Sequence, residues 1–130
     1  MRRLSIGLAF IFSILSGCQS VGIEEVVHEH GDIQNLEAFD AFVEHVENND
    51  EDEINFVNYG VEGQRGVYTL AFDGDQIHVS LSVDGDFINE YNCEAIKIEE
   101  EEEIQRYILQ QCSGNYTGDF ELLTIADHDN

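Results

Sequence analysis

The sequence contains no proline and only five lysine and arginine residues among 130, against 28 aspartate and glutamate residues. Because proline cannot donate a backbone hydrogen bond to a β-sheet, its absence leaves every candidate strand able to pair. The formal net charge is −23 at pH 7. A chain this acidic repels the phosphates of DNA and RNA, anionic lipid and anionic wall polymers, so we exclude nucleic acid as a partner.

The common catalytic motifs are absent as well. The sequence has no G-x-S-x-G nucleophile elbow, no H-E-x-x-H zinc motif, no phosphate-binding loop and no dinucleotide fingerprint. We therefore expect a protein that is not an enzyme. A hydrolase whose site forms only in the fold is the remaining catalytic alternative.

The N-terminal segment 1–17 has the parts of a cleaved export signal. Two arginines near the start are followed by a twelve-residue apolar run, Leu4–Leu15, and small residues precede Cys18. This run is shorter than the roughly 20 residues that a membrane-spanning helix requires. Leu15–Cys18 matches a lipobox, which predicts cleavage before Cys18 and a lipid anchor, with palmitate, on that cysteine. The alternative is a plain secretory signal followed by a chance cysteine.

Cleavage at this position would leave 113 residues, which is enough for one domain. It would remove two arginines and no acid, so the net charge would become −25. We expect residues 18–25 to form the lipidated cysteine and a polar tether, 26–126 the domain and 127–130 a polar tail. The acidity has two explanations: solubility in a saline exterior, or attraction of a cationic protein, peptide or divalent ion.

Three cysteines leave an odd one in an exported protein. If Cys18 carries lipid, Cys93 and Cys112 remain as a pair in an oxidising compartment. An antiparallel hairpin that places these two cysteines opposite each other matches apolar residues with apolar ones and an acid with a base, as cross-strand pairing favours. We therefore predict a disulfide between Cys93 and Cys112. The same register gives three further pairs: Ile96 with Leu109, Ile98 with Tyr107, and Glu99 with Arg106.

Helical periodicity occurs in one segment, Leu36–Val46, with apolar residues on one side and acids on the other. Asn35 is the predicted N-cap, and the polar run 48–52 ends the helix. The rest of the chain is strand-like, with Asp-Gly-Asp turns at 73–75 and 84–86. These features predict an α+β fold in which one amphipathic helix packs on an antiparallel sheet of about six strands. The predicted strands are 54–59, 67–72, 76–83, 91–98, 104–111 and 120–125.

His28 and His30 are the candidate metal ligands. In an extended segment both side chains project to the same face, where an acid could complete a Zn²⁺ or Cu²⁺ site. The alternative is two exposed or hydrogen-bonded histidines beside a turn. The Asp-Gly-Asp turns and the glutamate run Glu99–Glu103 lack the spacing of an EF-hand loop, so we expect only weak cation binding there. We expect no cofactor, with a divalent cation at the two histidines as the alternative.

Several short motifs occur in a fixed order along the mature chain. They are His30-Gly31, the helix positions from Ile33 to Phe42, Glu62-Gly63, the Asp73-Gly74 hairpin, and Cys93 with Cys112. This order resembles a family of small bacillary lipoproteins that carry a domain of unknown function, DUF4362. The resemblance covers about Val26 to Ile125 and departs at Gln64-Arg65, where the family has an aspartate-proline pair. It implies an α+β fold at a Gram-positive cell surface, and no activity.

Together these features predict a lipoprotein that is anchored to the outer face of the cytoplasmic membrane. We expect it to act as a non-enzymatic binding or interaction module, with a cationic protein or peptide as its partner. An extracytoplasmic metal-binding protein that uses His28 and His30 is the first alternative, and a hydrolase is the second.

Overall fold

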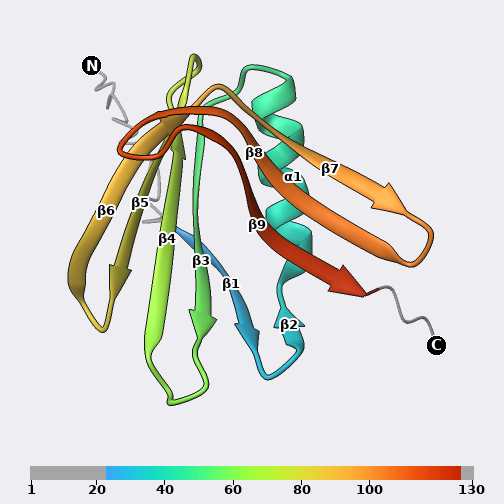
Figure 1. Cartoon of the computed structure of the whole chain (residues 1–130). Coiled ribbons are helices and arrows are strands. Elements are labelled where there is room, and N and C mark those ends of the chain that lie inside the picture. Colours follow the sequence, from blue (N-terminus) through green and yellow to red (C-terminus); the bar gives the residue numbers. More distant parts are fainter. Residues whose placement is uncertain (1–22, 127–130) are drawn as a thin grey trace, which may run out of the picture.

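A nine-stranded sheet and one helix make up the part of the chain that the computed structural model describes, residues 23–126 (Figure 1). The predicted signal 1–17, Cys18 and the tail 127–130 lie outside the described residues. The elements are β1 Glu24–Glu29, β2 Asp32–Gln34, α1 Leu36–Glu47, β3 Asp52–Tyr59, β4 Arg65–Phe72, β5 Ile77–Val83, β6 Asp86–Cys93, β7 Ala95–Glu101, β8 Ile104–Gly114 and β9 Gly118–Ala126.

The sheet curls into a half-barrel, and the strands are antiparallel with one exception. The order is β2-β1-β3-β4-β5-β6-β8-β7, and β9 pairs with the other edge of β8. β1 runs parallel to β3, because α1 lies between them in sequence and returns the chain to the starting end. Strands β8 and β9 arch from β6 across the helix side in Figure 1. The α+β class is confirmed and the sheet is mostly antiparallel, as expected, although the parallel pairing of β1 with β3 was not predicted.

The prediction of about six strands is wrong, because the sheet has nine within residues 23–126. The predicted strand 91–98 is two strands, β6 and β7, with the change at Glu94. β1 begins at Glu24, inside the predicted tether, and β2 is only three residues long. β2 is too short to produce a recognisable alternation in the sequence, and tertiary pairing with β1 defines it instead.

Helix α1 covers one side of the curled sheet and contacts β1, β3 and β7. Its apolar residues form one buried face, as the periodicity predicted: Phe39, Phe42, Val43 and Val46. Asn35 occupies the predicted N-cap position, but the predicted capping bond is absent. This residue has a left-handed φ of 66° and makes no side-chain hydrogen bond to the start of α1. The short amide side chain tolerates this conformation better than most residues do.

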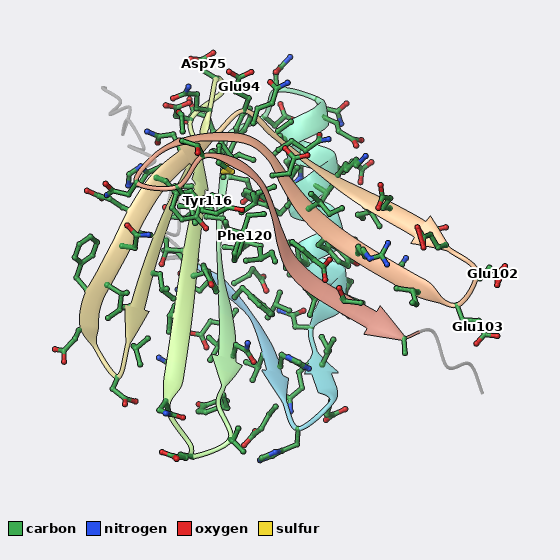
Figure 2. The ribbon with its side chains drawn as sticks, in the orientation of Figure 1. Asp75, Glu94, Glu102, Glu103, Tyr116 and Phe120 are labelled. Atoms are coloured by element: carbon green, nitrogen blue, oxygen red, sulfur yellow. A yellow bond between two sulfur atoms is a disulfide. The ribbon has the colours of Figure 1, made fainter. Side chains whose placement is uncertain are left out.

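Aromatic side chains join the helix to both halves of the half-barrel. The ring of Phe39 lies 4.6 Å from that of Tyr107 on β8 and 5.7 Å from that of Phe56 on β3, measured between centroids. All three side chains are fully buried. Figure 2 places Tyr116 and Phe120 under the arch of β8 and β9, where their ring centroids are 5.4 Å apart. The ring of Phe120 also lies 5.9 Å from that of Tyr68 on β4, so it packs the arch against the sheet.

The β7–β8 hairpin has the register that the sequence predicted. Ile96 pairs with Leu109, Ile98 with Tyr107 and Glu99 with Arg106. A disulfide joins Cys93, the last residue of β6, to Cys112 of β8. The predicted pairing of these cysteines is therefore present in the structure, although they lie just beyond the regular ladder.

The glutamate run belongs partly to a strand and partly to a turn. β7 includes the first three glutamates, while Glu102 and Glu103 form the tip of the hairpin and point away from the fold in Figure 2. Arg106 stands among three acids, with nitrogen–oxygen distances of 3.0 Å to Glu101, 3.6 Å to Glu99 and 3.7 Å to Glu121. These carboxylates raise the pKa of Arg106, mainly through the hydrogen bond that its guanidinium donates to Glu101. One cation thereby offsets the repulsion within the run.

Candidate functional site

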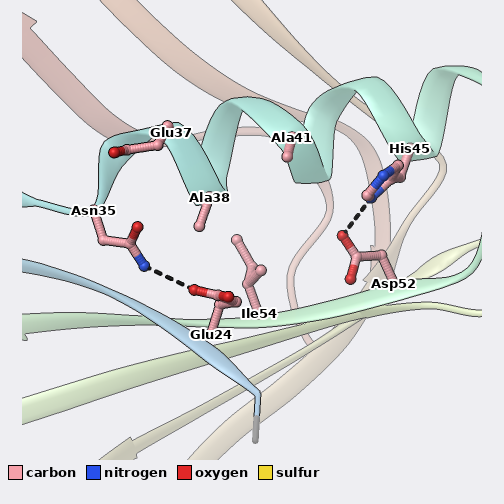
Figure 3. Close-up of a pocket in the computed structure, with 8 residues that line it drawn as sticks. All are labelled: Glu24, Asn35, Glu37, Ala38, Ala41, His45, Asp52 and Ile54. Atoms are coloured by element: carbon pink, nitrogen blue, oxygen red, sulfur yellow. Dashed lines mark hydrogen bonds and ion pairs between the residues drawn. The ribbon is translucent and has the colours of Figure 1, made fainter. Parts of the chain in front are cut away.

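A groove of about 290 Å³ runs along helix α1, between the helix and strands β1 and β3 (Figure 3). We call it the α1 groove. Its floor is apolar, and its rim carries carboxylates and one histidine. The lining residues are Glu24, Asn35, Glu37, Ala38, Ala41, His45, Asp52 and Ile54.

Small side chains on α1 create the groove. Ala38 and Ala41 lie three residues apart, so they occupy neighbouring positions on one helix face, and His45 follows one turn later. A methyl group fills little of the space between a helix and a sheet. Ile54 of β3, which is almost fully buried, forms the opposite part of the floor. The result is an aliphatic channel parallel to the helix axis.

One end of the groove is fixed by Asn35. Its Nδ2 donates to Oε1 of Glu24 and to the backbone carbonyl of Glu25, both at 3.0 Å. The left-handed backbone at Asn35 turns its amide away from the helix and toward β1. This amide therefore holds the Glu24 carboxylate at the groove rim, as Figure 3 shows.

The other end of the groove carries an ion pair. His45, in the last turn of α1, places Nδ1 2.7 Å from Oδ2 of Asp52 at the start of β3. The hydrogen bond to Asp52 is the main reason that the pKa of His45 rises above its ordinary value of 6.5. Burial opposes that rise, while the charges of Asp52, Asp50 and Glu44 add to it. Both partners stay in contact with water, since their side chains are 45% and 27% exposed.

The groove carries acids and lacks lysine or arginine among its lining residues. Glu24, Glu37 and Asp52 provide three carboxylates, and none of the hydrogen bonds or ion pairs of the described chain involves the Glu37 side chain. Such an arrangement attracts a cation that also has aliphatic surface, because the charge meets the rim while the carbon chain covers the floor.

Catalysis would use the same histidine. His45 with Asp52 has the form of a base held by an acid, as in hydrolytic sites. However, the lining residues include no serine, threonine or cysteine that could serve as a nucleophile.

The two histidines singled out in the sequence lie away from this groove. His28 is in β1 opposite Asn58 of β3, and His30 is in the turn after β1 with a φ of 53°. The premise that both lie in one extended segment is wrong, since a left-handed residue breaks the strand alternation. Within residues 23–126 no group of three or more histidine, cysteine, aspartate or glutamate side chains could hold a metal ion. The metal site stays a prediction from the sequence.

Both Asp-Gly-Asp segments form hairpin turns. Gly74 and Gly85 have φ values of 96° and 87°, which glycine adopts without strain. In the first turn, Oδ1 of Asp73 accepts hydrogen bonds from the backbone N–H groups of Asp75 and Gln76, each at 2.9 Å. These bonds lower the pKa of Asp73. Its carboxylate is therefore occupied by the turn itself.

Sequence reasoning missed the α1 groove because its residues come from three separate elements. One local signal existed: Ala38, Ala41 and His45 form a stripe of helical spacing between the buried apolar face and the exposed acids. A stripe of small residues beside a core face indicates a place where the helix does not fill the space next to the sheet. Nothing in the sequence indicates which strand acids face that stripe.

The described part of the chain, residues 23–126, holds no helix long and apolar enough to cross a membrane.

Comparisons with known proteins identify the family of the chain. No curated protein and no solved structure matches the chain. A family model described as a domain of unknown function, DUF4362, matches residues 23–108, from the residue before β1 into β8. This match spans more than half of the 130 residues and confirms the resemblance seen in the sequence, and the chain belongs to the DUF4362 family.

Proposed function

We propose that this protein is a non-enzymatic binding module that holds an organic cation in the α1 groove. We also propose that a lipid on Cys18 anchors it to the outer face of the cytoplasmic membrane. The observation that supports the binding role is the combination of three rim carboxylates with an aliphatic floor. The lipobox at Leu15–Cys18 supports the anchor.

The shape of the groove favours an elongated cation over a metal ion. Asn35 and His45 mark its two ends and lie ten residues apart along the helix, which corresponds to about 15 Å. A divalent metal ion needs several ligands within 2 to 3 Å of one point, whereas the groove acids are spread along its length. A linear polyamine, or a lysine or arginine side chain of a partner, can place positive charge and methylene groups along the same path.

The expected affinity is modest. Exposed ion pairs contribute about 0.2–1 kcal/mol each, and each buried methylene contributes about 0.8 kcal/mol. Three such pairs and three methylenes give about 3–5 kcal/mol before the cost of ordering the ligand is subtracted, so the dissociation constant is expected to be on the order of 1 mM or weaker. Added salt should weaken this binding, because the rim carboxylates are in contact with water.

Calorimetric titration of the mature chain with spermidine tests this function. Glu37→Gln removes a rim carboxylate that has no partner in the fold, so it should weaken binding about threefold while leaving the structure intact. Glu47→Gln is the matched control, since it removes one negative charge from an exposed position on the same helix outside the groove. Equal affinity in both variants would mean that spermidine responds only to the overall charge.

A further inference from the structure

Strand β6 has a sheet edge that residues 23–126 leave open. It pairs with β5 along its whole length but with β8 only at Tyr91 and Asn92. Next to these pairs, Nδ2 of Asn115 donates to the carbonyl of Glu90 at 3.1 Å and occupies the end of the edge nearest β8. From Asp86 to Asn89, β6 has no second neighbouring strand in the described part of the chain.

Two large apolar side chains lie at this edge. Phe87 is 63% exposed and Ile88 is 53% exposed. The register between β5 and β6 shifts here: Leu81 pairs with Asn89 and Ser82 with Phe87, so Ile88 is an extra residue in a β-bulge. Charges and bulges hinder further pairing at an edge strand, and β6 carries both, with acids at Asp86 and Glu90 and a bulge at Ile88. Adjacent exposed phenylalanine and isoleucine side chains have the opposite effect, because they offer apolar surface to an added strand.

The other face of the same strands is also apolar. A groove of about 330 Å³ lies at this end of the half-barrel, and its apolar lining includes Tyr68, Leu81 and Val83. That groove is lined from β3, β4, β5 and the turn between β3 and β4, and Leu81 lies on the face of β5 opposite to Ser82, the partner of Phe87. An extended segment added to the edge of β6 would therefore meet Phe87 and Ile88, and not this groove.

The acids beside this edge determine which kind of partner it attracts. Asp84, Asp86 and Glu90 flank the edge, and β5 and β6 contain no lysine or arginine. A second copy of the chain would bring the same acids and a large negative charge to the contact, and the two copies would repel each other. A segment that carries lysine or arginine between apolar residues complements both the acids and the apolar surface of Phe87 and Ile88.

We propose that the edge of β6 at Asp86–Asn89 binds an extended cationic segment of another protein by β-strand addition. The backbone of the segment pairs with β6, its apolar side chains cover Phe87 and Ile88, and its basic side chains face the flanking acids. Main-chain pairing provides affinity in this mode of recognition, and the side-chain pattern provides selectivity. The surface is separate from the α1 groove, so the two sites are testable independently.

The test uses a short blocked peptide of alternating lysine and valine, titrated into the mature chain at physiological salt. Amide resonances of Asp86–Asn89 should shift in the NMR spectrum, whether or not the lysine side chains also shift those of the α1 groove. The same peptide with every residue N-methylated keeps its charge and apolar side chains but has no backbone donors. It should bind at least about fivefold more weakly, since strand pairing depends on those donors.

Variants separate the edge from general attraction to an acidic surface. Phe87→Ser should weaken peptide binding about fivefold or more, and Ile88→Ser is a second variant of the same surface. Val61→Ser is the matched control, because Val61 is 96% exposed in the turn between β3 and β4 and away from this edge. Circular dichroism confirms that each variant is folded. Equal binding of the N-methylated peptide, or equal affinity in the Phe87→Ser and Val61→Ser variants, would overturn the proposal.

Discussion

Removal of the Cys93–Cys112 disulfide is expected to destabilise the domain substantially. The bridge closes a loop of 18 residues between the cysteines and ties the end of β6 to β8. In the chain-entropy model, a loop of this length restricts the unfolded chain by about 3 kcal/mol. Both cysteines are buried, so replacing them with alanine also removes packed sulfur atoms from the core.

The assay is urea unfolding of the mature chain and of the double variant Cys93→Ala/Cys112→Ala, followed by circular dichroism. The free energy of unfolding should fall by about 2–4 kcal/mol, and the midpoint temperature should fall by on the order of 10 °C. Reductant supplies the internal control: it should lower the stability of the parent chain to near that of the variant and leave the variant unchanged.

A loss below about 1 kcal/mol would contradict this reasoning. It would mean either that the unfolded chain already holds β7 and β8 together or that the two thiols are not joined. Intact-mass measurement after alkylation, with and without prior reduction, separates these two causes.

Three further predictions concern the helix and its contacts. In urea unfolding, Phe39→Ala should lower the free energy of unfolding by about 3–5 kcal/mol, because this buried ring contacts Phe56 and Tyr107. A loss as small as that of Phe87→Ala, at an exposed position, would contradict the place of Phe39 in the core. Tyr107→Phe should lower the free energy of unfolding by about 0.5–3 kcal/mol in the same assay, since it removes the 2.5 Å hydrogen bond to Asp40. Burial, and after it this hydrogen bond, raises the pKa of Tyr107. In an NMR pH titration, His45 should titrate above 6.5 and return toward that value in Asp52→Asn. Because the folded-state pKa is raised, the stability that this pair adds should be complete below the unfolded pKa and lost as pH rises through the folded pKa.

Local features of the fold were predictable because their determinants lie close together in sequence. The buried face of α1 follows from apolar residues at helical spacing. The register of the β7–β8 hairpin follows from pairs such as Glu99 with Arg106, which are separated by one short turn. Both Asp-Gly-Asp turns follow from the need for a positive φ at glycine.

The strand count was missed where pairing, and not composition, defines a strand. Strand β6 contains Asp86, Asn89 and Glu90, which disfavour strands, and a bulge interrupts its alternation. The parallel pairing of β1 with β3 connects segments that lie on either side of α1. No local pattern records such a contact.

The candidate site was the least predictable feature. Asn35 suggested an N-cap from its position, but its left-handed backbone directs the amide to Glu24 instead. His45 and Asp52 are only seven residues apart, yet the turn between α1 and β3 had to be placed before they could be paired. The metal site predicted at His28 and His30 rested only on their spacing, which suits an extended strand.

The most direct test of the central claim is NMR mapping of spermidine on the mature chain. Amide shifts should concentrate along Asn35–His45 and Asp52–Ile54, the two sides of the α1 groove. These shifts should shrink in Glu37→Gln and persist in Glu47→Gln. Shifts spread over the acidic surface, or concentrated at the hairpin tip with Glu102 and Glu103, would contradict a cation site in the groove.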